Sequence, residues 1–415
     1  MTDSVLTTLE QAVSALVHEL RPRCPEYLRE HEIRILVPTG VELGDGSRMV
    51  AEIGAALGLT LVTARDDAEA NAVDRLLTAR LDDAAGRLAE LDATPAEDLA
   101  ALIARSGTTP PSAQPDLDWQ ELAVGGERMR FATVGTRGTP VVLINALAQA
   151  PDFWFELIDR LLPRRVVLFQ CGGVLEDDVR PEGLSVDQLR TGLEGVLDHL
   201  GHSTHHLVGW CTGARFATRL AHLRPDLVAS LTMLNGAFKQ LGADSADDSA
   251  YERVIETMCR TVENQPELAD QLAVMVSGSV GRPSAGPDGD RQAAGRAALA
   301  GVDPAFNDLL RAPVRDGIRL RRYAHQLFQL FSEDPFAMLP PAGPPVLCIA
   351  GEYDEQVSLP RFARVAATIP DARFATVAGG THFLLHDRPD LVAELLTDLF
   401  AGIAPRPATQ EISWR

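Results

Sequence analysis

Residues 207–215 read Leu-Val-Gly-Trp-Cys-Thr-Gly-Ala-Arg, which places Cys211 between Gly209 and Gly213. The pattern G-x-C-x-G has the spacing of a nucleophile on a sharp turn between a strand and a helix. Glycines at these two positions remove the Cβ atoms that would clash with the neighbouring elements. Amides and the dipole at the start of the helix would stabilise a thiolate there. Cys211 is therefore a candidate nucleophile, and the motif alone leaves a buried structural cysteine open.

An acid and a base follow later in the chain. Asp354 comes after the apolar run at 345–350, and His382 comes after the run at 373–377. The order nucleophile, acid, histidine is the one that a nucleophile on such a turn requires. His382 would take the thiol proton or pair with the thiolate, and Asp354 would fix its tautomer. Other acidic residues lie near Asp354 in the sequence and could take its place. The alternative for His382 is a surface histidine without a catalytic role.

The rival acids are Glu352 and Glu355, which share the segment with Asp354. Asp354 is the residue we expect beside the histidine. Cys171 is a second thiol to consider, because the loop after the run at 165–169 also borders the expected site.

The elements that must hold these residues alternate between strand and helix. We expect a hairpin and then further elements at these positions: strands 121–124, 128–134, 141–144, 165–169, 205–210, 229–234, 345–350 and 373–377, and helices 186–200, from 212, 359–368 and 388–401. Repeated β-α units after an initial hairpin predict an α/β fold with a mostly parallel sheet and helices on both faces.

A long insertion separates two of these strands. Residues 236–343 are predicted to be largely helical, with a Gly/Pro/Ser-rich break at 277–288. An insertion of this length between two strands is usually functional, so we expect a lid over Cys211.

The hairpin, the turn at Cys211, the insertion, the acid and the histidine together resemble the α/β-hydrolase fold superfamily over residues 118–403. The resemblance implies an oxyanion hole made by the amides of Leu147 and Thr212. Residues 145–147 read Asn-Ala-Leu where the superfamily usually has His-Gly-x.

A cysteine at this turn would form a thioester. Amines, thiols and carbanions readily take the acyl group from a thioester. In the superfamily, cysteines stand here in polyhydroxyalkanoate synthases, dienelactone hydrolases and some enzymes associated with polyketide or nonribosomal peptide assembly, and the chain looks most like the last group. The resemblance implies an acyltransferase or thioesterase-like enzyme acting on an acyl thioester bound to coenzyme A or a carrier protein. An ester or lactone hydrolase, or a binding protein with a structural cysteine, are the alternatives.

The region before the hydrolase-like part has a different pattern. Residues 1–106 are predicted to form an accessory domain, mostly helical or α/β, with a helix at 4–20, strands at 33–37 and 59–62, and helical segments at 48–57 and 67–103. A Pro/Ser/Thr-rich linker at 107–117 follows, and 404–415 is expected to be a tail. The accessory domain is a candidate surface for homo-oligomer formation.

The composition disfavours several classes of binding partner and cofactor. The 415 residues carry a formal net charge of −20, which disfavours binding to nucleic acid or to anionic membranes. The five cysteines lack C-x-x-C pairing, so neither a disulfide framework nor a zinc site is expected, and no cofactor is predicted. The first residues do not resemble a signal peptide, and no apolar run reaches the roughly 18 residues that span a bilayer. We therefore expect a cytoplasmic protein.

Overall fold

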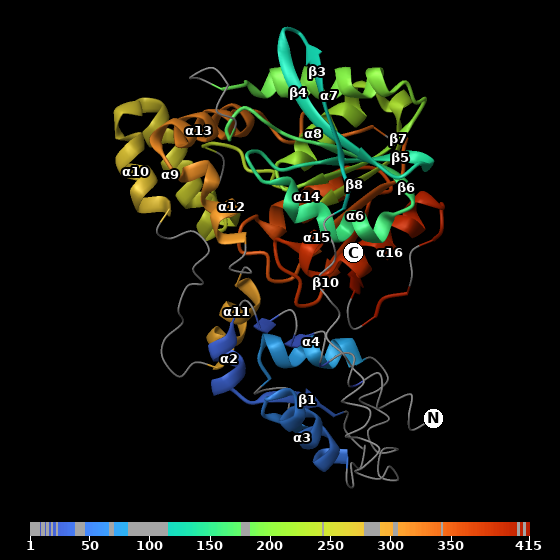
Figure 1. Ribbon diagram of the computed structural model, residues 1–415, viewed down its shortest axis with the longest axis vertical. Coiled ribbons are helices and arrows are strands. Elements are labelled where there is room, and N and C mark those ends of the chain that lie inside the picture. Colours follow the sequence, from blue (N-terminus) through green and yellow to red (C-terminus); the bar gives the residue numbers. More distant parts are fainter. Residues whose placement is uncertain are drawn as a thin grey trace. The chain divides into compact units, whose positions relative to one another are not determined.

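The computed structural model is shown in Figure 1. It describes residues 9, 13, 16, 17, 20, 21, 24–37, 46–65, 70–81, 115–175, 183–242, 245–277, 291–301, 306–341, 343–404, 407–409 and 412–415. The chain divides into two compact units. The first comprises Met1–Pro111, Gly281–Ala305 and Ala408–Ser413, and the second comprises Ser112–Val280, Phe306–Pro407 and Trp414–Arg415.

The first unit is a small α/β assembly. Its elements are α2 (Pro25–Glu30), β1 (Ile33–Leu36), α3 (Gly46–Leu57), β2 (Leu61–Ala64), α4 (Ala72–Leu81) and α11 (Arg291–Ala300). Strands β1 and β2 pair in parallel, close to the two predicted strands. The described apolar positions of the helix predicted at 4–20 are helical and buried: Leu9, Val13, Leu16, Val17 and Leu20. Of the helix predicted at 67–103, only α4 lies within the described residues.

Helix α11 belongs to this first unit, whereas the sequence placed it inside the insertion of the second. It contacts α4 and α2. Arg291 forms an ion pair of 2.8 Å with the fully buried Asp74, and Gln292 Nε2 donates to the Ala70 carbonyl at 2.7 Å. The pattern of 236–343 predicted helices correctly but could not tell which core each helix joins. The predicted break at 277–288 lies outside the described residues beyond Ser277.

A nine-stranded sheet has the order β11-β10-β9-β8-β7-β5-β6-β4-β3, and its strands β3 to β10 lie in the second unit. The strands are β3 (Asp118–Val124), β4 (Glu127–Val134), β5 (Arg137–Ile144), β6 (Arg164–Phe169), β7 (His205–Trp210), β8 (Val228–Leu234), β9 (Val346–Gly351), β10 (Arg373–Val377) and β11 (Ile412–Trp414). Strands β5 to β10 are parallel to one another, and β3 and β4 are antiparallel, so the predicted α/β fold is confirmed. The predicted tail at 404–415 contains β11, which is too short to show a pattern in the sequence.

Helices flank this sheet: α6 (Phe155–Leu161), α7 (Val186–Leu200), α8 (Gly213–Leu223), α14 (Leu359–Thr368), α15 (Leu384–Asp387) and α16 (Pro389–Phe400). Helices α6 and α16 pack together on the side of the sheet opposite to α7 and α8 (Figure 1). Alternate strand residues enter the core under α7 and α8, among them Val142 and Ile144 of β5. The strand order reverses between β5 and β7, and the ends of these two strands are where such sheets bind ligands.

The insertion between β8 and β9 is helical in its described part. In the second unit it contributes α9 (Ala250–Asn264), α10 (Ala269–Ser277), α12 (Asn307–Arg311) and α13 (Gly317–Ser332). Helix α13 packs against both α9 and α10. Within the described residues, no helix is long and apolar enough to cross a membrane.

Strand β7 buries a histidine whose titration should be visible in the stability of the protein. His206 is 8% exposed, its Nδ1 lies 2.8 Å from Ser230 Oγ, and its ring stacks on Phe400. Burial, helped by the charge of Arg164, lowers the pKa of His206 to about 4. In the unfolded chain the pKa is roughly 6.5, so the unfolded state binds the proton first as the pH falls.

This stability is complete above pH ~6.5 and is lost as the pH falls toward about 4. Between pH 7.5 and pH 5 the loss in unfolding free energy should be about 2 kcal/mol. Urea unfolding of His206→Gln should show a smaller loss, whereas a variant of the exposed His199, His199→Gln, should behave as the wild type. An equal loss in His206→Gln would contradict this assignment.

Candidate active site

Cys211 lies between the end of β7 and the start of α8 with a φ of 52°, in the left-handed region that few non-glycine residues adopt. Its amide donates to the Leu234 carbonyl at 3.0 Å, and its carbonyl accepts from the Ala237 amide at 3.0 Å. These bonds to the last residue of β8 and to the segment after it hold the strained backbone in place. The side chain is half-buried.

The two glycines of the motif are required by close packing at this turn. A Cβ at Gly209 would lie 2.6 Å from the Gly213 carbonyl oxygen, and one at Gly213 would lie 2.2 Å from the Ile144 oxygen. Helix α8 can therefore begin directly against the ends of β5 and β7 only with glycine at both positions. The sequence pattern predicted this geometry correctly.

The acid and the histidine meet at the ends of β9 and β10. His382 Nδ1 lies 2.8 Å from Asp354 Oδ2, with side chains 4% and 1% exposed. The other carboxylate oxygen of Asp354 accepts from the amides of Gln356 and Val357 at 2.8 and 3.0 Å. The carboxylate is thus fixed by its own loop, and it orients the imidazole so that Nε2 is the nitrogen left for other contacts.

The rival carboxylates point elsewhere. Glu352 Oε2 accepts from the Gly379 amide at 3.0 Å, and Glu355 is exposed. Of the three acids in this segment, the structure brings Asp354 to the histidine.

His382 also shares a side-chain hydrogen bond with Cys211. Burial by itself would lower the pKa of His382, but the charges of Asp354 and Cys211, with their hydrogen bonds, outweigh it and raise this pKa to about 10. The imidazolium is therefore the favoured form at neutral pH.

The two positions predicted for an oxyanion hole lie together. The Leu147 amide follows β5 and donates to Thr212 Oγ1 at 2.8 Å, and both residues are buried. Thr212 stands at the N-terminus of α8. The structure thus places both residues beside Cys211, with the Leu147 amide directed to a hydroxyl.

Asn145 shapes this loop where the superfamily usually has histidine. Its Oδ1 accepts from the Ala146 amide at 3.0 Å and from Trp154 Nε1 at 2.9 Å, and its Nδ2 donates to the Gln149 carbonyl at 2.7 Å. The side chain is fully buried. The Asn145 carboxamide therefore stabilises this loop as both a donor and an acceptor of hydrogen bonds. Its position in the sequence alone did not reveal this role.

Comparison with known proteins identifies the family of this fold. Residues 139–389 match the family model described as alpha/beta hydrolase fold. The chain belongs to the alpha/beta hydrolase fold family. A mutant haloalkane dehalogenase DatA from Agrobacterium tumefaciens shares the hydrolase fold, with a TM-score of 0.55, 16% identity, and coverage of 70% of this chain and 100% of that one.

Two curated relatives match parts of this chain. The dihydrolipoyllysine-residue acetyltransferase component of the acetoin cleaving system of Pseudomonas putida is 26% identical over 215 residues, which is 45% of this chain and 55% of the relative. Polyketide synthase ThaQ of Burkholderia thailandensis is 29% identical over 272 residues, which is 63% of this chain and 12% of the relative. The chain spans about half of the first relative and a small part of the second.

Asn235, directly after β8, supports the loop that carries His382. It is fully buried with a φ of 44°, and its Nδ2 donates to the carbonyls of Thr381 and His382 at 3.0 and 2.8 Å. Its Oδ1 accepts from the Gly351 amide at 2.8 Å. One side chain therefore ties β8 to the loops after β9 and β10. The only signal in the sequence is an Asn, which tolerates a positive φ, just after a strand.

Aromatic rings surround His382. The ring centroids of Trp210 and Phe383 each lie 5.5 Å from that of His382, and Phe153 stacks on Phe383 at 5.4 Å. Phe306, from the insertion, stacks on Phe153 at 4.8 Å. These rings limit the access of water to the base.

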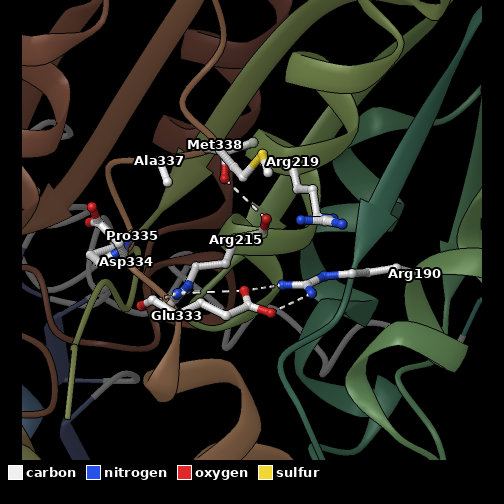
Figure 2. Close-up of a pocket in the computed structure, with 9 residues that line it drawn as sticks. Arg190, Arg215, Arg219, Glu333, Asp334, Pro335, Ala337 and Met338 are labelled. Atoms are coloured by element: carbon white, nitrogen blue, oxygen red, sulfur yellow. Dashed lines mark hydrogen bonds and ion pairs between the residues drawn. The ribbon is translucent and has the colours of Figure 1, made fainter.

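A pocket of about 190 Å³ lies elsewhere in the second unit, and none of the predicted site residues lines it. Figure 2 shows Arg190 and Arg215 directed toward Glu333. Arg190 makes two hydrogen bonds to the Glu333 carboxylate at 2.6 and 2.5 Å, and Arg215 donates to the Glu333 and Lys239 carbonyls. The side chains around this pocket therefore connect α7 and α8 to Glu333, which directly follows α13.

Proposed function

We propose that this hydrolase processes acyl thioesters through a covalent acyl-enzyme on Cys211, with His382 as base and acid and Asp354 as the residue that orients it. The contact that carries the proposal is the hydrogen bond between Cys211 and a buried His382 whose pKa is raised to about 10. A histidine that holds its proton beside the sulfur favours a thiolate–imidazolium pair, which attacks a thioester without a further base.

In the first half-reaction the Cys211 sulfur attacks the thioester carbonyl. The oxyanion forms at the N-terminus of α8, where the Thr212 amide donates to it. The Leu147 amide, which here donates to the Thr212 hydroxyl, becomes the second donor when that hydroxyl rotates away. The bond to the leaving thiol then breaks, and His382 gives that thiol its proton. The products are a free thiol and an acyl group on Cys211.

In the second half-reaction an acceptor nucleophile loses its proton to His382 and attacks the acyl group, which releases Cys211. The aromatic rings around His382 favour transfer to a bound acceptor over attack by water. The similarity to an acetyltransferase component and to a polyketide synthase supports an acyl group carried on a thiol, such as coenzyme A or a carrier protein. Hydrolysis of esters or lactones is the second candidate, because half-buried Cys211 is within reach of water.

Replacing Cys211 by serine separates these two functions. If the enzyme is a transferase, its transfer rate should fall at least about 100-fold in Cys211→Ser. The reason is that an oxygen ester transfers its acyl group to acceptors less readily than a thioester. A hydrolase should keep or gain hydrolysis with serine. Chromatography of the products, with an amine or thiol acceptor present or omitted, measures both.

If the wild type releases only free acid, at a rate that no acceptor changes, the transferase proposal fails and the hydrolase remains.

A further inference from the structure

Two side chains from other segments hold the backbone of His382. This residue follows β10 and belongs to neither a helix nor a strand, so no regular hydrogen-bond ladder fixes its peptide. Its carbonyl accepts from Trp210 Nε1 at 2.9 Å and from Asn235 Nδ2 at 2.8 Å. A carbonyl oxygen has two lone pairs, so these two donors fill both of its acceptor positions.

The two donors differ in what else they connect. Asn235 also bonds the Thr381 carbonyl and the Gly351 amide, so it ties several loops together. The Trp210 indole has a single N–H, and it donates that hydrogen to His382. Trp210 is also the last residue of β7 and directly precedes Cys211. One residue is therefore joined to the nucleophile through the chain and to the base through its side chain.

The indole of Trp210 has little room to rotate. The residue is 1% exposed, and its ring centroid lies 5.4 Å from that of Phe153 and 5.8 Å from that of Phe383. The ring of Trp154 makes an edge contact with it at 6.4 Å. Rotation of the indole would break these ring contacts, so its N–H keeps its direction toward the His382 carbonyl.

The imidazole of His382 is fixed at a second point. Asp354 Oδ2 lies 2.8 Å from Nδ1, which leaves Nε2 for the nucleophile. Because the carbonyl and Nδ1 are both held, the direction of Nε2 depends on both contacts. A displacement of about 1 Å in a reacting group can lower a rate about 100-fold, so a bond that fixes the backbone of the base bears on catalysis.

We propose that Trp210 is a positioning residue for the base: its indole N–H holds the His382 backbone where Nε2 reaches Cys211. The proposal rests on the proposed function, since it assigns Trp210 a part in forming the thiolate–imidazolium pair. Trp210 does not touch the acyl group in this role and acts only through His382.

Two measurements that need no acyl substrate test this role. Alkylation of Cys211 by iodoacetamide at pH 7, followed by mass spectrometry of its peptide, should be about tenfold slower in Trp210→Phe, because the ion pair forms less often. Nuclear magnetic resonance should show His382 titrating at least about one pH unit lower in this variant. The reason is that the contacts with Asp354 and Cys211, which raise the pKa of His382, are weakened.

Trp154→Phe is the matched control. Trp154 belongs to the same group of rings and is fully buried, but its Nε1 donates to Asn145 Oδ1 at 2.9 Å. This variant should keep the wild-type alkylation rate of Cys211 and the wild-type titration of His382. If Trp210→Phe does not fold, 3-benzothienylalanine at position 210 replaces it in both measurements, because this analogue keeps the ring shape and has sulfur in place of N–H.

The outcomes distinguish this proposal from the proposed function. Wild-type alkylation and titration in the variants at position 210 overturn the positioning role, even if thioesters acylate Cys211. Equal losses in Trp154→Phe indicate a general packing role and also overturn it. Losses confined to the variants at position 210 support it, even if no thioester acylates the wild type, in which case only the proposed function fails.

Discussion

Cys211→Ala should fold like the wild type and process acyl thioesters at least about 10⁴-fold more slowly. Alanine keeps the Cβ that the φ of 52° already accommodates, and the lost sulfur contributes a half-buried contact rather than core packing. The kcat/KM for thioester consumption measures the loss, and circular dichroism measures the fold. Cys171→Ala is the matched control, since Cys171 is a buried thiol after β6 and should be dispensable.

The same variant should change the titration of His382. The charge of Cys211 is one of the causes that raise the pKa of His382 to about 10, so this pKa should fall when the sulfur is removed. Nuclear magnetic resonance of the imidazole follows it directly. A residual rate above about one per cent of the wild type, or an unchanged His382 titration, would contradict the role of Cys211.

Asp354→Asn should lower kcat/KM by about 10³-fold with little change in KM. The carboxylate is the largest of the causes that raise the pKa of His382, so its loss leaves a base that is less often protonated and less firmly oriented. Glu352→Gln is the matched control, because that side chain bonds the Gly379 amide instead. Equal losses in the two variants would show that the acid has been misassigned.

Stability against pH gives a second readout of this pair. The folded-state pKa of His382 is raised above the unfolded value of roughly 6.5, so its contribution is fully present below pH ~6.5. That contribution is lost as the pH rises through about 10. Asp354→Asn should therefore show a weaker decline in unfolding free energy across this window than the wild type.

The local sequence pattern was sufficient to predict many helices and strands of the second unit. The bounds of α7 and β7 agree with the predicted helix and strand, because a Ser cap, a terminal Gly and a continuous apolar run mark them in the sequence. The glycines around Cys211 likewise predicted that backbone segments pack closely there, and the structure confirms this packing.

Other features depend on contacts between distant segments. Helix α11 joins the first unit through Arg291 and Asp74, which are far apart in the chain, and no local pattern specifies that partner. The bond from the Leu147 amide to the Thr212 hydroxyl follows from how β5 and α8 meet. Asn235 is a comparable case, since its partners follow two later strands.

Mass spectrometry of the acyl-enzyme tests most directly whether Cys211 carries the acyl group. The wild type is mixed with an acyl thioester, quenched in acid, and analysed intact and after proteolysis. We expect a mass increase of one acyl group, located on the peptide that contains Cys211 and missing in Cys211→Ala. An adduct on Cys171, an adduct that persists in Cys211→Ala, or turnover with no adduct in single-turnover samples would contradict it.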